Sequence, residues 1–254
     1  MPIDLSRRRL LTAGAAALAL SGCKVLDRVG DPDDPLRNFM EGANGLTHRT
    51  QGLLRGDALA PEFTKADIRQ GMRPNGVSNP PDEDYKALAA NGFADWRLMV
   101  TGSVEQPLSL DLASLMAMPS RTQITRHDCV EGWSCIAEWT GVQLSRVLAE
   151  ARPTADARFV VFRCMDTIEQ SLSGGIRYWE SIDLRAANHP QSILAYGMNG
   201  GALPIANGAP LRLRVERQLG YKMAKYVSAI EVVPALADSG GYWESHGYDW
   251  YAGL

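Results

Sequence analysis

The segment with the clearest potential for chemistry is residues 126–134, which read Arg-His-Asp-Cys-Val-Glu-Gly-Trp-Ser. Cys129 stands there among polar side chains and shortly before Gly132 and Trp133. A cysteine in such a setting can be a reactive thiol or a ligand for a soft metal ion, because the thiolate is the active form in both roles. A lone cysteine is also often an inert, buried side chain. The segment by itself therefore leaves three interpretations open.

Several common kinds of site are absent from the sequence. It contains no glycine-rich phosphate loop, CxxC pair or HExxH motif, and no Gly-x-Ser-x-Gly nucleophile turn. A histidine-rich zinc site is disfavoured because the histidines are few and widely separated. They are His48, His127, His189 and His246. The net charge of −3 and the lack of a large basic cluster argue against a nucleic-acid partner.

Two further motifs lie in the second half of the chain. Residues 207–213 read Asn-Gly-Ala-Pro-Leu-Arg-Leu, and residues 220–225 read Gly-Tyr-Lys-Met-Ala-Lys. In this order, and together with residues 126–134, they resemble the sulfite oxidase-like molybdopterin-binding oxidoreductases. The resemblance is nearest to the branch that contains the bacterial periplasmic methionine sulfoxide reductase catalytic subunit. It covers residues 95–254 and implies a molybdenum–molybdopterin cofactor (Mo-MPT).

The resemblance also implies roles for individual residues. Cys129 would be the catalytic thiolate ligand of molybdenum, beside the two dithiolene sulfurs of one pterin, and a thiolate suits such a soft ligand set. Asn207 and Arg212 would bind the pterin or its phosphate. Residues 223–225 would hold the phosphate through charge-assisted hydrogen bonds. The implied cofactor-binding residues are Asn75, Thr167, Asn207, Arg212, Met223, Ala224 and Lys225.

Two of these assignments rest on looser matches to the family pattern. Thr167 stands for the family's threonine contact after the strand that follows the cysteine segment, although the spacing differs. The upstream loop of the family is matched by the turn-rich residues 73–80, in which Asn75 is the first candidate and Asn79 the second. The exposed face of a strand remains the alternative for Arg212, because Leu211–Val215 alternate between apolar and polar residues.

The reaction implied by the resemblance is a two-electron oxygen-atom transfer, of the sulfite-oxidation or sulfoxide-reduction type, on a small or peptidyl sulfur substrate. Arg126 and Arg217 are candidates for an arginine cluster that would hold an anionic substrate. The sequence lacks a C-x-x-C-H haem attachment motif, so a separate membrane haem protein or cytochrome is expected to exchange the electrons. The alternative is a non-catalytic lipoprotein that retains the fold as a binding or assembly factor.

The first residues predict export. Arg7 and Arg8 precede an apolar stretch of small residues, the layout of a twin-arginine signal over residues 1–22, with an ordinary secretory signal as the alternative. Leu20-Ser21-Gly22-Cys23 resembles a bacterial lipobox; otherwise it is a simple cleavage site. We expect a periplasmic protein whose only membrane contact is a lipid on Cys23. Three cysteines then remain, so at least one of them must be unpaired or bound to something else.

The elements that must position these residues are predicted by hydrophobic period. Alternation predicts strands at 96–100 and 226–233, an apolar run predicts one at 159–162, and residues 122–129 are expected to be extended. Helices are predicted after Asp111 and over 144–151. Strands predominate, so the predicted fold is α+β, with a mixed β-sheet and short peripheral helices.

The predicted domain organisation has three parts. Residues 1–22 form the signal, residues 23–94 a tether and irregular segment, and residues 95–254 the molybdopterin-binding oxidoreductase domain. The C-terminal residues 241–251 are rich in aromatic side chains. They are expected to pack onto the core, with a rim near the active site or a docking surface as the alternative.

Overall fold

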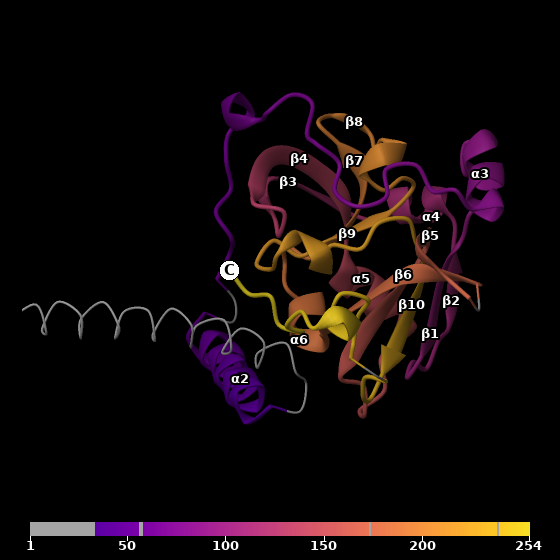
Figure 1. Cartoon of the computed structure of the whole chain (residues 1–254). Coiled ribbons are helices and arrows are strands. Elements are labelled where there is room, and N and C mark those ends of the chain that lie inside the picture. The colour runs from indigo at the N-terminus through magenta and orange to yellow at the C-terminus, as the bar shows by residue number, and fades with distance from the viewer. Residues whose placement is uncertain (1–33, 56–57, 173, 238) are drawn as a thin grey trace, which may run out of the picture. The chain divides into compact units, whose positions relative to one another are not determined.

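The computed structural model describes residues 34–55, 58–172, 174–237 and 239–254 (Figure 1). The chain divides into two compact units, residues 1–56 and residues 57–254. The described part of the first unit is one helix, α2 (Pro35–Arg55). The signal and Cys23 lie outside the described residues. In the part of the chain that is described, no helix has the length and apolar character needed to cross a membrane.

The segment predicted to be irregular, residues 23–94, contains two α-helices. They are α2 and α3 (Glu83–Ala90), and a short 3-10 helix, η1 (Lys65–Asp67), lies between them. The sequence of α2 hides its helical character because it includes Gly42 and Gly45, which disfavour helices. The helix α3 buries only Tyr85, so it shows no apolar period. Residues 58–94 also belong to the same compact unit as residues 95–254, so the unit begins earlier than predicted.

Two five-stranded β-sheets form the second unit (Figure 1). The first sheet has the order β2 (Leu108–Leu110), β1 (Leu98–Gly102), β10 (Val227–Val233), β5 (Phe159–Ser171) and β6 (Gly174–Asp183). The second has the order β3 (Ser120–Cys129), β4 (Trp133–Gln143), β7 (Ile193–Met198) and β8 (Gly201–Ala202), and β9 (Arg212–Arg214) pairs with β7. Only the β1–β10 pair is parallel among the described pairs, so the first sheet is mixed and the α+β prediction is confirmed.

The helices of this unit are short. Besides η1 and α3, they are α4 (Leu112–Ala117), α5 (Leu144–Ala151), α6 (Leu184–Ala187), η2 (Ile205–Asn207), η3 (Gly220–Lys222) and η4 (Glu244–His246). Asp111 caps α4, because its side chain accepts a hydrogen bond from the backbone N–H of Ser114 at 2.7 Å. The predicted apolar face of α5 is fully buried. Both predicted helices are therefore confirmed.

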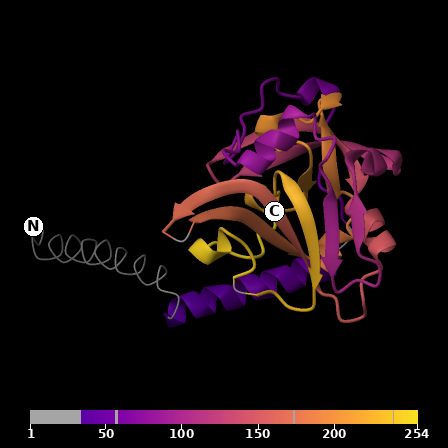
Figure 2. The same ribbon diagram turned by 90° about the vertical axis from the view of Figure 1, so that its right-hand side faces the viewer.

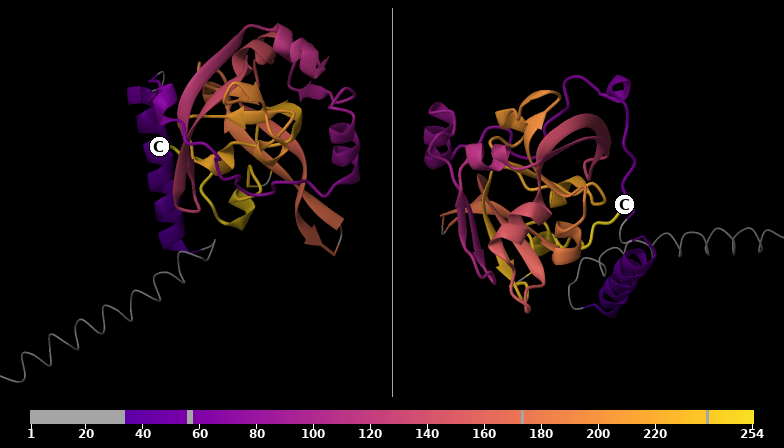
Figure 3. Two further views of the ribbon diagram at one scale, coloured as in Figure 1. Left: turned by 90° about the horizontal axis from the view of Figure 1, so that it is seen from above. Right: turned by 180° about the vertical axis from the view of Figure 1, so that it is seen from behind.

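The main hydrophobic core contains buried side chains from both sheets, including Val100 and Phe162 of the first and Val142 and Leu194 of the second. A smaller core lies around Trp139 of β4. The β5–β6 hairpin extends beyond the rest of its sheet, as the views from the side and from above both show (Figures 2 and 3). Leu172, beside the turn of this hairpin, is fully exposed.

The alternating residues 211–215 include β9, and their polar face is buried. An exposed strand face was the alternative for Arg212, but Arg212 and Arg214 are both completely buried and Glu216 is 5% exposed. Trp139 covers them, with its ring centroid 4.8 Å from Cζ of Arg212 and 4.3 Å from Cζ of Arg214. Alternation along a strand indicates two faces, but it does not show what covers the polar one.

Candidate functional site

A cavity of about 300 Å³ lies where β3, β5, β6 and the C-terminal segment meet. It is lined by Asn75, Gly76, Val77, Cys129, Val130, Glu131, Asp166, Ile168, Tyr178, Gly220, Tyr221, Met223, Lys225, Trp243 and Tyr248. Four residues chosen from the sequence are among them: Asn75, Cys129, Met223 and Lys225. The structure thus brings together residues that are up to 150 positions apart in the chain.

Cys129 is the last residue of β3 and opens the turn to β4, which closes through a hydrogen bond from Gly132 N to Cys129 O at 3.1 Å. Gly132 has φ +84°, a conformation that favours glycine. Cys129 is partly exposed at the cavity, whereas Cys135 and Cys164 are buried, and these three described cysteines are all free of disulfides. The inert, buried cysteine is therefore Cys135 or Cys164 rather than Cys129.

The surroundings of Cys129 do not activate its thiol as a free nucleophile. Burial is the largest influence on its pKa and raises it above the usual value. A free thiol there stays protonated at neutral pH, whereas a bound metal would deprotonate it outright. No cluster of three or more histidine, cysteine, aspartate or glutamate residues suitable for a metal exists in the described portions of the chain. A metal at Cys129 therefore needs further ligands from a cofactor.

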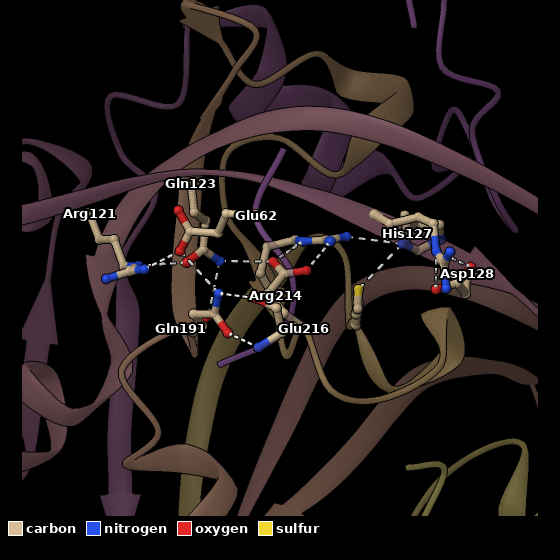
Figure 4. Close-up of polar contacts among 11 residues, drawn as sticks. Glu62, Arg121, Gln123, His127, Asp128, Gln191, Arg214 and Glu216 are labelled. Carbon is tan, nitrogen blue, oxygen red and sulfur yellow. Dashed lines mark hydrogen bonds and ion pairs between the residues drawn. The ribbon is translucent and has the colours of Figure 1, made fainter. Parts of the chain in front are cut away.

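A buried polar network supports the cysteine segment from behind (Figure 4). Arg214 forms a two-pronged ion pair with Glu216, at 2.9 and 2.5 Å, and its Nη1 donates to Nδ1 of His127 at 2.9 Å. Sδ of Met223 lies 3.3 Å from the same ring nitrogen. Burial lowers the pKa of His127 well below its usual value, and Arg214 lowers it further, so the ring is neutral. These contacts hold the side chain of His127, two positions before Cys129, in place.

The same network continues toward the surface (Figure 4). Gln123 donates to Glu216 at 2.8 Å and to the backbone carbonyl of Gln191 at 3.0 Å. The side chain of Gln191 reaches Glu62 at 3.1 Å, and Glu62 is paired with Arg121. The polar face of β3 is therefore anchored along its length, which makes the strand a rigid support for Cys129 at its end.

A second group of residues, next to Gly208, forms a buried cationic site. A Cβ atom on Gly208 would lie 3.0 Å from Cβ of Lys225 and 3.2 Å from Cβ of Arg212, so the two cationic side chains flank this glycine. Nη1 of Arg212 donates to the carbonyl of Asn207 at 2.8 Å. Its Nε and Nη2, and Nδ2 of Asn207, find no partner among the described residues. Unpaired buried donors are costly, so this site is built for an anion.

The electrostatics of this site also favour a bound anion. Burial lowers the pKa of Arg212 to about 9, and the neighbouring Arg214 acts in the same direction. Burial also lowers the pKa of Lys225 to about 7, with a further contribution from Arg212. A phosphate would supply the missing negative charge and the missing acceptors. The residues therefore fit the phosphate of a molybdopterin.

Lys225 also fixes the upstream loop. Its Nζ donates to the backbone carbonyls of Asn75 at 2.6 Å, of Val77, and of Ala206 at 3.2 Å. The hydroxyl of Tyr226 donates to the carbonyl of Val77 at 2.9 Å. The loop that the sequence matched to the family through Asn75 is therefore attached to the motif of residues 220–225.

Four predicted cofactor residues, Thr167, Asn207, Arg212 and Ala224, are not among the residues that line the described cavity. Thr167 is engaged by Asp82, which accepts from its backbone N at 2.8 Å and from its hydroxyl at 2.6 Å. Ala224 is buried, and its carbonyl accepts from Leu213 N at 2.8 Å. Asn207 lies with Arg212 in the cationic site. The arginine candidates Arg126 and Arg217 are likewise outside the described lining, and Arg126 pairs with Asp128 at 2.9 Å.

Sequence reasoning missed Asp166, which precedes Thr167 in the chain and lines the cavity. The ladder between β5 and β6 shifts register between Arg163 and Thr167, and three successive residues, 164–166, are buried there. Such a bulge turns a side chain away from the face that alternation predicts. Burial raises the pKa of Asp166 to about 6, and its Oδ1 has no partner in the described structure. This oxygen can accept a hydrogen bond from a cofactor.

Sequence reasoning also left the aromatic wall undecided. Tyr178 and Tyr221 line the cavity, and so do Trp243 and Tyr248 of the C-terminal segment. Tyr242 of the same segment is buried in the core. The C-terminal aromatic residues thus both pack onto the core and form a rim at the cavity. The richness of this segment in aromatic residues was the signal that identified it.

Comparison with known proteins agrees with this geometry. Residues 86–243 match the family described as the oxidoreductase molybdopterin binding domain. A protein of Azospira oryzae, provisionally named protein-methionine-sulfoxide reductase subunit YedZ1, is 34% identical over 97% of this chain and 86% of its own length. The protein-methionine-sulfoxide reductase catalytic subunit MsrP of Campylobacter jejuni is 33% identical, over 87% of this chain and 82% of its own.

A second MsrP catalytic subunit, of Xanthomonas campestris, is 32% identical over 92% of this chain and 71% of its own. Among solved structures, the sulfane dehydrogenase SoxCD of Paracoccus pantotrophus matches 56% of this chain and 39% of its own, with 25% identity and a TM-score of 0.49. The family match and the named catalytic subunits identify an enzyme, so the non-catalytic alternative is set aside. The chain belongs to the molybdopterin-binding oxidoreductases, and within them its relatives are methionine sulfoxide reductase subunits.

Proposed function

We propose that this chain is the catalytic subunit of an exported methionine sulfoxide reductase, which reduces sulfoxides of free or peptidyl methionine to the thioether. The cofactor is molybdenum–molybdopterin, with Cys129 as the protein's thiolate ligand. When bound, this cofactor supplies two-electron redox chemistry and takes up an oxygen atom. The protein's own residues bind, orient and shield the reacting groups.

The observation that carries the proposal is the pairing of two features in one site. A partly exposed cysteine lies at the cavity, and a buried site that contains Arg212 and Lys225 lies nearby, with unpaired donors on Arg212 and Asn207. Molybdopterin has dithiolene sulfurs at one end and a phosphate at the other. Its two ends match the two features, since thiolate and dithiolene ligands share a soft metal and the phosphate needs cationic donors.

The cavity wall suits a sulfur substrate. Tyr221, Trp243 and Tyr248 present aromatic rings, and sulfur atoms make favourable contacts at ring edges. Val130 is 42% exposed and Tyr248 is 40% exposed, so the cavity's rim reaches the molecular surface beside Cys129. A methionine side chain carried by a peptide can enter such a site without unfolding of the enzyme. We therefore include peptidyl sulfoxides in the substrate class.

Reduction of a sulfoxide consumes two electrons and two protons and releases the thioether and one water molecule. The electrons must come from a separate redox partner, because the sequence lacks a haem attachment motif. We propose a membrane haem protein or a cytochrome for this role. Export by a twin-arginine signal over residues 1–22, with a lipid on Cys23, would place the enzyme in the periplasm at a membrane surface.

Replacement of the cysteine tests the proposal. Cys129→Ser should fold normally but lose sulfoxide reduction with an artificial electron donor, because a hydroxyl is a hard, high-pKa ligand. Cys135→Ser is the matched control, since the Cys135 thiol is buried in β4 away from the cavity lining. The measurements are molybdenum content, the rate of methionine sulfoxide reduction and thermal unfolding. Wild-type activity in Cys129→Ser would contradict metal ligation by Cys129.

A further inference from the structure

Three charged side chains are buried behind one wall of the cavity and have no part in the cofactor site described above. Nζ of Lys222 donates to Oε1 of Glu180 at 2.5 Å and to Oε1 of Glu244 at 2.6 Å. None of the three side chains is more than 2% exposed. Two carboxyl groups therefore share one ammonium group in a place that bulk water does not reach.

This buried cluster adjoins the cavity through aromatic residues. Lys222 follows Tyr221, and Glu244 follows Trp243, and both aromatic residues line the cavity. Tyr178 also lines it and stands two residues before Glu180 on β6, where both side chains are buried on the same face. The phenol oxygen of Tyr178 lies 3.5 Å from Oε2 of Glu180. Tyr178 therefore lies between the carboxyl group of Glu180 and the cavity.

The two carboxyl groups are crowded together. A Cβ atom on Gly241 would lie 2.0 Å from Oε2 of Glu244 and 2.7 Å from Oε1 of Glu180, so both groups approach the same side of this glycine. Oε2 of Glu244 has no hydrogen-bond partner in the described parts of the chain. A second negative charge in this place would be neither hydrated nor paired, which is costly. One of the two carboxyl groups must therefore carry a proton.

The surroundings assign that proton to Glu180. Burial raises the pKa of Glu180 to about 8; Lys222 lowers it and Glu244 raises it. Three other titratable groups that interact with Glu180 are neutral at pH 7, because burial raises the pKa of each. They are Cys164, Tyr178 and Tyr221. Asp166 also acts on Tyr178, and its pKa of about 6 leaves it mostly ionised at pH 7. Within the described structure, Lys222 is thus the cation that faces the two carboxyl groups.

We infer that Tyr178 gives a proton to the oxygen atom that leaves the substrate, and that Glu180 restores the proton to Tyr178. The inference rests on the proposed sulfoxide reduction, which needs two protons for each turnover. It assigns one of them to this route; the other enters from solvent through the cavity. The two electrons come from the reduced haem-type partner, and the Glu180 cluster does not change the electron count.

The bonds balance as follows. The O–H bond of Tyr178 breaks as a new O–H bond forms on the departing oxygen. The O–H bond of Glu180 breaks as the O–H bond of Tyr178 forms again. The hydroxyl of Tyr178 donates to the carbonyl of Tyr221 in the resting structure, so it must rotate during the transfer. Glu180 is left as a carboxylate beside Lys222 and regains a proton from the cavity, through the hydroxyl of Tyr178, before the next turnover.

The expected pH dependence follows from the sign of the shift in Glu180. The carboxyl group is protonated below its pKa of about 8 and supplies the proton there. Above that value it is a carboxylate and has no proton to transfer. The wild-type kcat for sulfoxide reduction should therefore fall as the pH rises from 7 to 9, whereas KM should change little, because Glu180 does not contact the substrate.

Glu180→Gln tests the inference on the intact, cofactor-loaded enzyme. Glutamine keeps the shape and a hydrogen-bonding side chain but has no transferable proton. The kcat should fall about a hundredfold, the lower end of the range for general acids. The fall in kcat between pH 7 and 9 should disappear, while KM and molybdenum content stay as in the wild type. Tyr178→Phe should give the same result, and it serves the test if Glu180→Gln fails to fold.

Glu231→Gln is the matched control, because Glu231 is a half-exposed glutamate paired with Arg163 on the outer surface. It should retain the wild-type pH profile. A readout without turnover is the infrared signal of a protonated carboxyl group. We expect it at pH 7 in the wild-type protein, with loss above pH 9 and a weaker signal in Glu180→Gln. Wild-type kcat and pH profile in both Glu180→Gln and Tyr178→Phe, or a carboxyl signal unchanged by Glu180→Gln, would overturn the inference.

These outcomes separate the inference from the proposed function. A wild-type protein that binds molybdenum but reduces no sulfoxide would contradict the proposed function, and the proton route built on it would fall too. An active wild-type enzyme with an unaffected Glu180→Gln variant would contradict only the route through Glu180 and Tyr178.

Discussion

Arg212 and Arg214 lie two residues apart on β9 and both contact Trp139, yet their surroundings differ in kind. Arg214 has its counter-ion, Glu216, and a fixed acceptor on His127. Arg212 has one carbonyl partner and two nitrogens that find none among the described residues. Arg214 therefore has a structural role, whereas Arg212 has donors left that could bind an anion. This difference cannot be read from the alternating sequence of the strand.

Removal of one cationic group from the cofactor site should reduce cofactor affinity. A charge-assisted hydrogen bond to a buried phosphate contributes on the order of 1.5–3 kcal/mol, or roughly ten- to a hundred-fold in affinity. Arg212→Ala and Lys225→Ala should each purify folded but with less than one molybdenum per chain. Metal analysis and circular dichroism measure the two properties. Arg163→Ala, on the surface of β5, is the control and should keep its metal.

Arg214→Ala should behave differently from Arg212→Ala. It leaves Glu216 as an unpaired, buried carboxylate, and breaking a buried pair in this way costs about 3–5 kcal/mol. We expect a large loss of thermal stability in the presence or absence of the cofactor. Unfolding of Arg214→Ala and of the double variant with Glu216→Ala would be compared, and the double variant should recover part of the loss. Equal stability of wild type and Arg214→Ala would contradict the assignment.

The pKa of Lys225 predicts a pH dependence for the cofactor-free protein. Its folded pKa of about 7 lies below the usual value of 10.5, so the unfolded state binds more protons above pH 7. The contribution of Lys225 to stability therefore grows as the pH rises from 7 to 9. Thermal unfolding of the wild type and of Lys225→Met, measured at each pH without cofactor, isolates this contribution. The difference in slope should vanish with the cofactor bound, because phosphate keeps Lys225 charged.

At the scale of elements, the turn at η3 depends on a close approach. A Cβ atom on Gly220 would lie 2.6 Å from Cε1 and Nε2 of His127 and 3.1 Å from the carbonyl of Asp128. Gly220→Ala should therefore push η3 away from β3 and loosen the wall that carries Met223. Overpacking of this kind costs about 1–3 kcal/mol. We expect lower thermal stability and lower molybdenum content.

Gly45→Ala is the control for that substitution. Nothing lies within 4 Å of a Cβ atom on Gly45, which is inside α2. Alanine favours a helix interior by up to about 1 kcal/mol over glycine. This variant should keep its molybdenum and unfold at the same or a higher temperature. Loss of metal in Gly45→Ala, or its retention in Gly220→Ala, would contradict a local role for the close approach.

The sequence predicted the elements that have one buried side and one exposed side. The strand β1 and the helix α5 show the expected spacing of buried residues, and both were found. The helix α3 was missed because it buries a single side chain, and Asp166 was missed because a bulge breaks the alternation of β5. Hydrophobic periodicity reveals a regular element that is buried on one side. It does not reveal an element that is completely buried, an element that buries few side chains, or an irregular strand.

At the scale of the whole molecule, residues far apart in sequence form the site. Motifs located Cys129, Arg212 and Lys225, because the family resemblance covers those segments. The cluster of Lys222 with Glu180 and Glu244 has no sequence signature, since three elements must fold before the charges meet. Local pattern and resemblance therefore selected the candidate cofactor residues, but only the tertiary structure showed the buried charged groups behind them.

Export and anchoring can be tested on the full-length protein. Arg7→Lys with Arg8→Lys should leave cofactor-loaded precursor in the cytoplasm, because the paired arginines are the recognised feature of the signal. Cys23→Ala should release mature protein from the membrane fraction, since the lipid chains on that cysteine would be its anchor. Cell fractionation measures both results. A Cys23→Ala protein that still sediments with membranes would contradict lipid anchoring.

The attachment of the loop at residues 73–80 has a consequence for how the enzyme can be altered. Lys225 and Tyr226 hold this loop through the carbonyl oxygens of Asn75 and Val77, which every amino acid possesses. These carbonyl contacts do not depend on the side chains of the loop, although Val77 also packs against the core and Gly76 is constrained by its φ of +59°. Exchange of Asn75 should therefore change one wall of the cavity while the backbone stays in place. Asn75 is thus the position in this loop at which the chemistry of the cavity can be altered without release of the loop.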